Sequence, residues 1–232
     1  MATLRILSTL AVRGAFETSV LPAFERSAGA TVEAEWNPTA LLLKSIERGC
    51  LADVVVVTDD AMDRLEEGDL VDPASRIAIA VALLGVAVKA GAARPDISTA
   101  DAFRRTLIDA RSVAYSQNGA SGLYFAGLIG RIGLADTVGS RATIVPVGFT
   151  AERLPTGEAD LAVQLISELM VVDGIDVVGP FPAEYQSPTP FSAARLRRAG
   201  NREGAEAFLR HLRSSQARRA YQDAGLVPAE GG

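Results

Sequence analysis

Residues 53–58 read Asp-Val-Val-Val-Val-Thr, an unbroken β-branched run bounded by two polar residues. Such a run is typical of a strand that is covered on both faces, as strands of parallel sheets are. The segment that follows, residues 60–67, has a helical pattern that Gly68 ends. The same order of strand and helix recurs along the chain, and it predicts an α/β protein built from βα units around mainly parallel sheets.

Upstream of this run, two further βα units are expected. Residues 4–8 predict a strand, and residues 15–26 predict a helix because their apolar residues recur every three to four positions. Residues 31–35 predict the next strand. Asn37 and Pro38 come after it, where Asn37 is expected to cap the following helix and Pro38 to take its first position.

Downstream, residues 77–89 form an apolar segment long enough to be a strand that crosses between two lobes. Ser98 and Asp101 resemble a capping box for a helix at 100–109. A strand at 112–115 leads into a glycine-rich turn and a helix at 123–131. The remaining expected elements are strands at 143–147, 160–164 and 177–179, a polar helix or turn at 151–156, an extended connection at 186–190, and one helix at 204–224.

Composition excludes several classes of protein. The chain has 232 residues and 48% hydrophobic residues, enough to bury a core, and its net charge of −5 gives no electrostatic reason to bind nucleic acid or an anionic membrane. A single cysteine and a single histidine argue against an internal disulfide and a structural zinc site. No stretch approaches the roughly 20 apolar residues of a membrane helix, so the chain is not expected to be membrane-embedded.

The search for catalytic and cofactor motifs is negative, and neither a metal nor a cofactor is expected. The sequence has no Walker A loop, dinucleotide fingerprint, zinc-protease motif or nucleophile elbow. His211 lies in an amphipathic helical pattern, and a structural role is favoured over a role in a catalytic triad. Cys50 is interpreted as a small packed residue rather than a nucleophile.

Small polar residues recur where strands pass into helices. The N-terminus of a helix presents unpaired amides and the positive end of a dipole, so several such starts could hold an anion without a basic side chain. Each residue alone is also explained as an ordinary cap or turn. The candidate ligand-binding residues of this kind are Ser8, Thr9, Asn37, Thr39, Ser116, Asn118, Ser121, Gly122, Gln164 and Ser167.

Several strings in this order resemble the molybdate-binding-protein family of ABC-transporter solute receptors. They are residues 4–8, Asn37-Pro38-Thr39-Ala40, residues 52–56, Gly119-Ala120-Ser121-Gly122, Gly157-Glu158-Ala159-Asp160 and residues 208–226. The resemblance implies a type II periplasmic-binding-protein fold, with two α/β lobes joined by crossing strands and the ligand between them. Lobe I would comprise residues 1–80 and 187–232, and lobe II residues 81–186. It also implies a small anionic ligand and, for an exported protein, an ABC permease as partner.

In that family a tyrosine hydroxyl contributes to molybdate binding, and here its position falls on or next to Leu165. The surrounding string Gln-Leu-Ile-Ser-Glu-Leu, residues 164–169, is similar to an organic-acid branch that includes aconitate-isomerase-like members. Glu168 facing the ligand would repel molybdate, although it is also explained as an acidic residue in a first helical turn. Arg13 is a candidate carboxylate clamp or a solvated charge.

Two functions of different class follow. The first is binding of a small oxyanion or carboxylate, and the alternative is a cofactor-free isomerase of an unsaturated acid such as aconitate. Glu168 and Tyr115 are the candidate catalytic residues of the isomerase. As printed, the N-terminus shows no export signal, which favours a cytoplasmic protein; removal of such a signal would make it periplasmic.

Overall fold

The computed structural model describes residues 3–229 of the chain, and it divides into two compact units. Residues 1–2 and 230–232, which the expected first lobe includes, lie outside the described residues. The first unit holds the described residues up to Ala82 and from Thr189 onward, and the second unit is Leu83–Pro188. Within the described residues no helix is long and apolar enough to cross a membrane.

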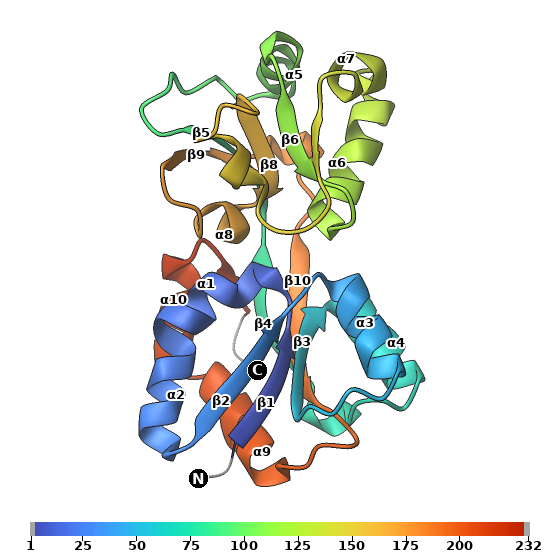
Figure 1. The fold of residues 1–232 in the computed structure, drawn as a ribbon, viewed down its shortest axis with the longest axis vertical. Coiled ribbons are helices and arrows are strands. Elements are labelled where there is room, and N and C mark those ends of the chain that lie inside the picture. Colours follow the sequence, from blue (N-terminus) through green and yellow to red (C-terminus); the bar gives the residue numbers. More distant parts are fainter. Residues whose placement is uncertain (1–2, 230–232) are drawn as a thin grey trace. The chain divides into compact units, whose positions relative to one another are not determined.

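The first unit is a six-stranded sheet in the order β11-β4-β10-β3-β1-β2 (Figure 1). Its strands are β1 (Thr3–Ser8), β2 (Thr31–Trp36), β3 (Val54–Thr58), β4 (Ile77–Ala82), β10 (Thr189–Arg195) and β11 (Val227–Pro228). β1 pairs in parallel with both β2 and β3, so these three strands end at one edge of the sheet. The run of four valines in β3 is completely buried, as expected from its sequence.

Helices cover both faces of this sheet (Figure 1). After β1 the chain winds through η1 (Leu10–Val12), α1 (Arg13–Ala15), the π-helical η2 (Phe16–Val20) and α2 (Leu21–Ala28). The other helices are α3 (Thr39–Glu47), α4 (Asp59–Glu67), the 3-10 turn η3 (Pro73–Ser75), α9 (Arg202–Leu212) and α10 (Ser215–Asp223). Leu42 of α3 and Met62 of α4 pack with Val55 on one face. Phe16, Phe24 and Phe208 form an aromatic cluster.

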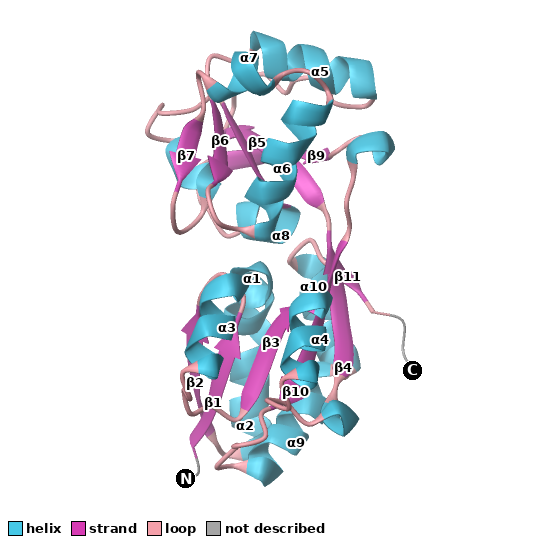
Figure 2. Cartoon of the chain, turned by 90° about the vertical axis from the view of Figure 1, so that its right-hand side faces the viewer, coloured by secondary structure: helices cyan, strands magenta, loops and turns pink. Residues whose placement is uncertain are grey.

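The second unit is a five-stranded sheet in the order β7-β6-β8-β5-β9. Figure 2 labels β7, β6, β5 and β9, and Figure 1 labels β8. Its strands are β5 (Leu84–Lys89), β6 (Val113–Ser116), β7 (Thr143–Val145), β8 (Leu161–Leu165) and β9 (Ile175–Pro180). β6, β7 and β8 run in parallel, whereas β5 is antiparallel to β8 and β9. The helices are α5 (Ala100–Asp109), α6 (Ala120–Arg131), α7 (Ala135–Gly139), η4 (Thr150–Arg153), α8 (Ile166–Leu169) and η5 (Ala183–Tyr185).

The structure corrects four expected elements. The apolar segment 77–89 is two strands, β4 and β5, rather than one. The last two residues of the extended connection expected at 186–190 already belong to β10, which pairs with β3 and β4 in the middle of the first sheet. The single helix expected at 204–224 is two helices, because the Ser214 side chain accepts a hydrogen bond from the amide of Ala217 and starts α10.

The fourth correction concerns the start of α5. The hydroxyl of Thr99, rather than Ser98, accepts from the amide of Ala102 and caps the helix. Ser98 instead donates to the carboxylate of Asp96, over 2.7 Å. Thr99 has the extended backbone of a cap residue, which places its hydroxyl over the first helical turn.

Candidate functional site

The helices of this protein fall into two groups according to how they begin. α5, α9, α10 and η3 begin with a side-chain cap, supplied by Thr99, Asn201, Ser214 and Asp72. The helical segments that directly follow β1, β2, β3, β6, β7, β8 and β9 have no side-chain cap. α1, η2 and α2, which continue from η1, and α7, which follows α6, also lack one. Apart from η5, which follows the antiparallel-paired β9, the uncapped starts that follow a strand lie at the carboxyl ends of parallel strands, where open α/β sheets bind ligands.

Only some of these starts are free to receive an anion. α4, α8, η4 and η5 each carry an acidic residue in the first turn, which would repel a negative ligand. The starts of η1, α3 and α6 carry none. Their first N–H groups have no acceptor within the helix, and the helix dipole adds partial positive charge there. These three starts are the candidate anion-binding groups.

In the first unit, the residues after β1 and β2 are joined through their backbones. Ser8 is fully buried, its hydroxyl donates to the carbonyl of Thr9 over 3.3 Å, and its own carbonyl accepts from the amide of Asn37 over 3.1 Å. Thr9 is 5% exposed, and its hydroxyl has no hydrogen-bond partner among the described residues. Thr39 is half-buried in the first turn of α3.

Asn37 does not cap α3, contrary to the expectation from sequence. Pro38 is the N-cap residue. The side-chain amide of Asn37 donates through Nδ2 to the carboxylate of Glu35 over 2.8 Å. The extended backbone of Pro38 delays the helix by one residue, which moves Asn37 out of reach of the first free amides. The α3 start therefore keeps its N–H groups unpaired by any side chain.

In the second unit, the start of α6 is packed tightly against the end of β6. The Ser116 hydroxyl accepts from the amide of Gly119 over 2.9 Å. A Cβ atom at Gly122 would lie 1.8 Å from the Ser116 carbonyl oxygen, so only glycine allows this approach. Ser121 is 5% exposed without a hydrogen-bond partner among the described residues, whereas Asn118 is exposed on the turn.

A buried polar network lies at the end of the neighbouring strand, β8. The Oε1 atom of Gln164 accepts from the amide of Thr150 over 2.8 Å and lies 3.0 Å from the Thr150 hydroxyl. The Nε2 atom of Gln164 donates to the carbonyl of Gly148 over 3.4 Å. Ser167 is buried, and its hydroxyl has no partner within the described part of the chain. Thr150 was not predictable as a site residue, because nothing in a sequence indicates a side-chain pairing over this separation.

Glu168 belongs to the same network. It is 8% exposed, and burial raises the pKa of its carboxyl to about 7, although hydrogen bonds from the Leu165 backbone and the Gln164 side chain act in the opposite direction. The desolvation of the charged form is the dominant cause. A carboxyl with a pKa near neutrality can both accept and return a proton at physiological pH.

Two other candidates lie in ordinary structural surroundings. The Tyr115 ring packs against Phe125 of α6, with ring centroids 5.2 Å apart. The Arg13 guanidinium pairs with the carboxylate of Glu17 over 3.0 Å in a half-exposed i,i+4 ion pair. His211 contacts the carbonyl of Val20 through Nε2 and packs beside Phe24, in keeping with a structural role.

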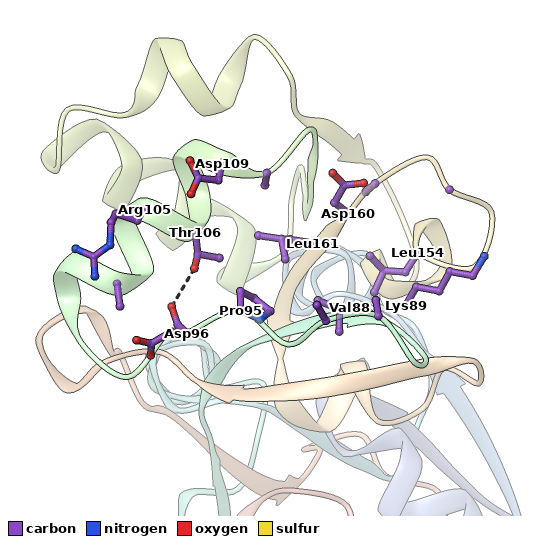
Figure 3. A pocket seen from close by; sticks show the side chains of 16 residues that line it. Val88, Lys89, Pro95, Asp96, Arg105, Thr106, Asp109, Leu154, Asp160 and Leu161 are labelled. Atoms are coloured by element: carbon purple, nitrogen blue, oxygen red, sulfur yellow. Dashed lines mark hydrogen bonds between the residues drawn. The ribbon is translucent and has the colours of Figure 1, made fainter.

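Two hollows lie at the opposite, amino-terminal edges of the sheets. The larger, of about 640 Å³, lies in the second unit between α5 and the start of β8 (Figure 3). Two of the charged side chains that line it are engaged, because Asp160 pairs with Arg111 and Lys89 donates to the Pro155 carbonyl. The smaller hollow, of about 480 Å³, lies beside Asp53 in the first unit. Neither contains an uncapped helix start, and no group of metal-ligating residues occurs in the part of the chain that the structure describes.

A family model and a curated relative both match nearly the whole chain. A family model described as "Bacterial extracellular solute-binding protein" matches residues 4–227. A curated relative, aconitate isomerase from a Pseudomonas species, is 34% identical over 234 residues, covering 98% of this chain and 88% of the relative.

Among solved structures, the Azotobacter vinelandii periplasmic molybdate-binding protein superposes with a TM-score of 0.81 at 21% identity, covering 98% of this chain and all of that one. The sulfate-binding protein SubI of Mycobacterium tuberculosis H37Rv superposes with a TM-score of 0.79 at 17% identity, covering 99% and 88% of the two chains. At these identities the likeness establishes the fold alone. It confirms the expected type II periplasmic-binding-protein fold.

Proposed function

Because the chain belongs to the family of bacterial extracellular solute-binding proteins, we propose that it binds a small anion, an oxyanion or a carboxylate. One observation carries the proposal: the starts of η1, α3 and α6 have neither a side-chain cap nor an acidic first turn. All three follow parallel strands, whereas the capped helices do not.

The chemistry of these starts suits an anion. Backbone N–H groups at a helix start donate to negative oxygens, and the helix dipole strengthens the attraction. The unpartnered hydroxyls of Thr9 and Ser121 add one donor in each unit. Neutral donors of this kind bind an anion without a lysine or arginine, so the acidic net charge of the chain is no obstacle.

A thermal-shift screen tests the proposal. Molybdate, tungstate, sulfate and a panel of di- and tricarboxylates are added separately to the protein. A ligand at 100 times its dissociation constant stabilises a protein by about 2.7 kcal/mol. Ser121→Ala, at the start of α6, should reduce the shift caused by that anion, while Thr143→Val, in the same unit and away from the helix starts, should not. If no anion raises the melting temperature, the proposal is wrong.

Delivery of the anion to the permease of an ABC transporter is part of this proposal for an exported protein. The description of the family as extracellular supports it. Fractionation of cells that carry the native gene tests the location, and recovery in the periplasm is expected for a transport role. Recovery in the cytosol alone would contradict transport and favour an enzymatic role.

A second function, isomerisation of an unsaturated carboxylic acid such as aconitate, is favoured by a specific observation. Glu168 is a buried carboxyl with a raised pKa of about 7, and it lies in the same unit as the free start of α6. A general base works best when its pKa is near the operating pH. The 34% identity to an aconitate isomerase over nearly the whole chain supports this choice.

The proposed reaction is a 1,3 proton shift. Ionised Glu168 removes a proton from the allylic carbon of the acid, and the electron pair of the broken C–H bond spreads into the conjugated carboxylate. N–H groups at the start of α6, in the same unit, would stabilise that negative charge. Glu168 then returns the proton to the far carbon of the allylic system. The double bond moves and the isomers interconvert with no oxidant, reductant or co-reactant.

Deuterium exchange tests the isomerase directly. Protein treated with EDTA is incubated with trans-aconitate in deuterated water, and NMR follows both the cis isomer and deuterium incorporation. Glu168→Gln should lower turnover by about a hundredfold or more, whereas Glu47→Gln, on the exposed face of α3, should not change it. Unchanged substrate at high protein concentration would contradict the isomerase and leave the binding function.

A further inference from the structure

Asn118 is the one asparagine of this chain that is followed by glycine. The other two are Asn37, followed by Pro38, and Asn201, followed by Arg202. The side-chain amide of an asparagine can be attacked by the backbone nitrogen of the next residue. Proline has no N–H to ionise, an arginine side chain hinders the attack, and glycine leaves its nitrogen unshielded. The sequence therefore favours this reaction at residue 118.

The structure separates the three asparagine side chains in the same way. Asn201 is held at both ends of its amide, because Oδ1 accepts from the Gly204 amide over 2.9 Å and Nδ2 donates to a backbone carbonyl over 3.3 Å. Nδ2 of Asn37 donates to the Glu35 carboxylate over 2.8 Å. Asn118 is exposed, and its side chain makes no hydrogen bond within the part of the chain that the structure describes. Its amide carbon is therefore free to turn toward the next residue and open to water.

The glycine that makes this pair reactive is required by the fold. A Cβ atom at Gly119 would lie 2.8 Å from Oγ and 3.3 Å from Cβ of Ser116. The backbone N–H of Gly119 donates to the same Oγ atom over 2.9 Å. Ser116 therefore disfavours any larger residue at position 119. Its hydroxyl also holds the proton that must leave before the Gly119 nitrogen can attack.

We propose that Asn118 is a site of spontaneous deamidation, and that the new carboxylate weakens anion binding at the start of α6. The Gly119 nitrogen loses its proton to solvent base and forms a bond to Cγ of Asn118. The bond from Cγ to the side-chain nitrogen breaks, and ammonia leaves. Water then opens the five-membered ring at either carbonyl, which gives aspartate or isoaspartate. Water is the only co-reactant, and the chain gains one negative charge.

The new charge would arise beside the free amides of α6, so this second part rests on the anion-binding function proposed above. Asn118 comes two residues before Ala120, the first residue of the helix, and their Cα atoms lie no more than about 8 Å apart. That separation is within the Debye length of about 8–10 Å at ordinary salt concentrations. A carboxylate there repels a multiply charged anion, but it interacts favourably with the dipole of α6 and should not lower the stability of the helix.

Ageing the purified protein at mildly alkaline pH tests the modification without any ligand, because alkali ionises the attacking nitrogen. Peptide mapping by mass spectrometry should show a gain of one mass unit at Asn118 and none at Asn37 or Asn201. Ser116→Ala removes the acceptor of the Gly119 N–H and should speed the reaction about twofold to tenfold, the value of one hydrogen bond. Asn118→Gln is the matched control, since it keeps an amide that must close a larger ring, and it should stay unmodified over the same period.

Calorimetric titration with trans-aconitate at low salt tests the consequence for binding. The aged protein and Asn118→Asp should both bind it about threefold to tenfold more weakly than the fresh protein. Added salt should narrow the difference, because it screens the repulsion. The melting temperature of Asn118→Asp without ligand should not fall. Asn118→Gln should show the same affinity before and after ageing.

The outcomes separate this proposal from the proposed function. No mass gain at residue 118 would overturn the modification, whatever the protein binds. Equal rates in Ser116→Ala and wild type would overturn the protection of the Gly119 nitrogen by Ser116. Equal affinities of Asn118→Asp and the fresh protein would overturn the effect on binding. A fresh protein that binds no anion would overturn the proposed function and, with it, the effect on binding, while the mass gain would still support the modification.

Discussion

Replacing Gly122 with alanine tests whether the start of α6 is held rigidly against β6. The new Cβ would lie 1.8 Å from the Ser116 carbonyl oxygen and 2.6 Å from its carbonyl carbon. To reach ordinary van der Waals contact at 3.4 Å from 1.8 Å, the helix start must move by about 1.6 Å. The obstacle is backbone, so no side-chain rotation can relieve the contact.

Gly122→Ala should reduce both the stability of the fold and the affinity for the anion. Overpacking of a buried site costs about 1–3 kcal/mol, which corresponds to a fall in melting temperature of roughly 2–12 °C for a protein of this size. Displacing the α6 amides by more than half a hydrogen-bond length should also remove at least one bond to the anion, or about tenfold to a hundredfold in affinity. The assays are a thermal melt and calorimetric titration with the anion that stabilises the wild-type protein most.

Gly130→Ala is the matched control. It lies in the same helix, and its Cβ would meet nothing within 4 Å. It should leave anion affinity unchanged and raise stability by about 0.5–1 kcal/mol, because alanine favours the helix over glycine. If Gly122→Ala melts and binds like Gly130→Ala, the close approach of α6 to β6 does not hold the anion-binding amides, and the reasoning is refuted.

Three further predictions follow from single residues. Burial raises the pKa of Glu168 from 4.5 to about 7, so the folded state holds this proton more tightly than the unfolded state. The free energy of unfolding, relative to that of Glu168→Gln, should therefore fall by about 3 kcal/mol as the pH rises from 4.5 to above 7. Denaturant unfolding across that pH range measures it. Asp53→Ala should lower the free energy of unfolding by about 2–3 kcal/mol in a denaturant titration. The buried carboxylate accepts from the backbone amides of Arg5 and Asn201 over 2.8 and 2.7 Å, and both amides would lose their partner. A decrease of less than about 0.5 kcal/mol would contradict this. The family resemblance implies that the molybdate-binding tyrosine falls on or next to Leu165, so this protein should bind molybdate about tenfold to a hundredfold more weakly than a receptor that has the hydroxyl. Nanomolar affinity in a calorimetric titration would show that another donor replaces it.

The strands with continuous apolar runs were predictable from sequence, because burial on both faces leaves a direct mark on residue type. β3, with its four valines, is the clearest case. β10 was not predictable, because Pro190 weakens the strand pattern and its pairing depends on β3 and β4, which are distant in the sequence. The break between α9 and α10 was hidden because the apolar spacing continues across Ser214, which is also an acceptable surface residue within a helix.

The candidate site was predictable only as a set of residue types. Thr9 and Thr58 are of the type that caps helices, yet neither does so here. Whether a hydroxyl turns onto its own helix or away from it depends on the backbone around it and cannot be read from residue identity. The pairing of Thr150 with Gln164 was equally invisible, since it joins a turn to a strand 14 residues away in sequence.

The most direct test of anion binding by free helix amides is a pair of proline substitutions. Ala120 is the first residue of α6, and Gly119 before it is extended, so proline fits there and removes only an N–H donor. Ala100 is the equivalent first residue of α5, whose start is capped by Thr99. Calorimetric titration of trans-aconitate should show binding about tenfold or more weaker in Ala120→Pro than in wild type, with Ala100→Pro unchanged and all melting temperatures similar. Equal affinity in Ala120→Pro and wild type would contradict the account.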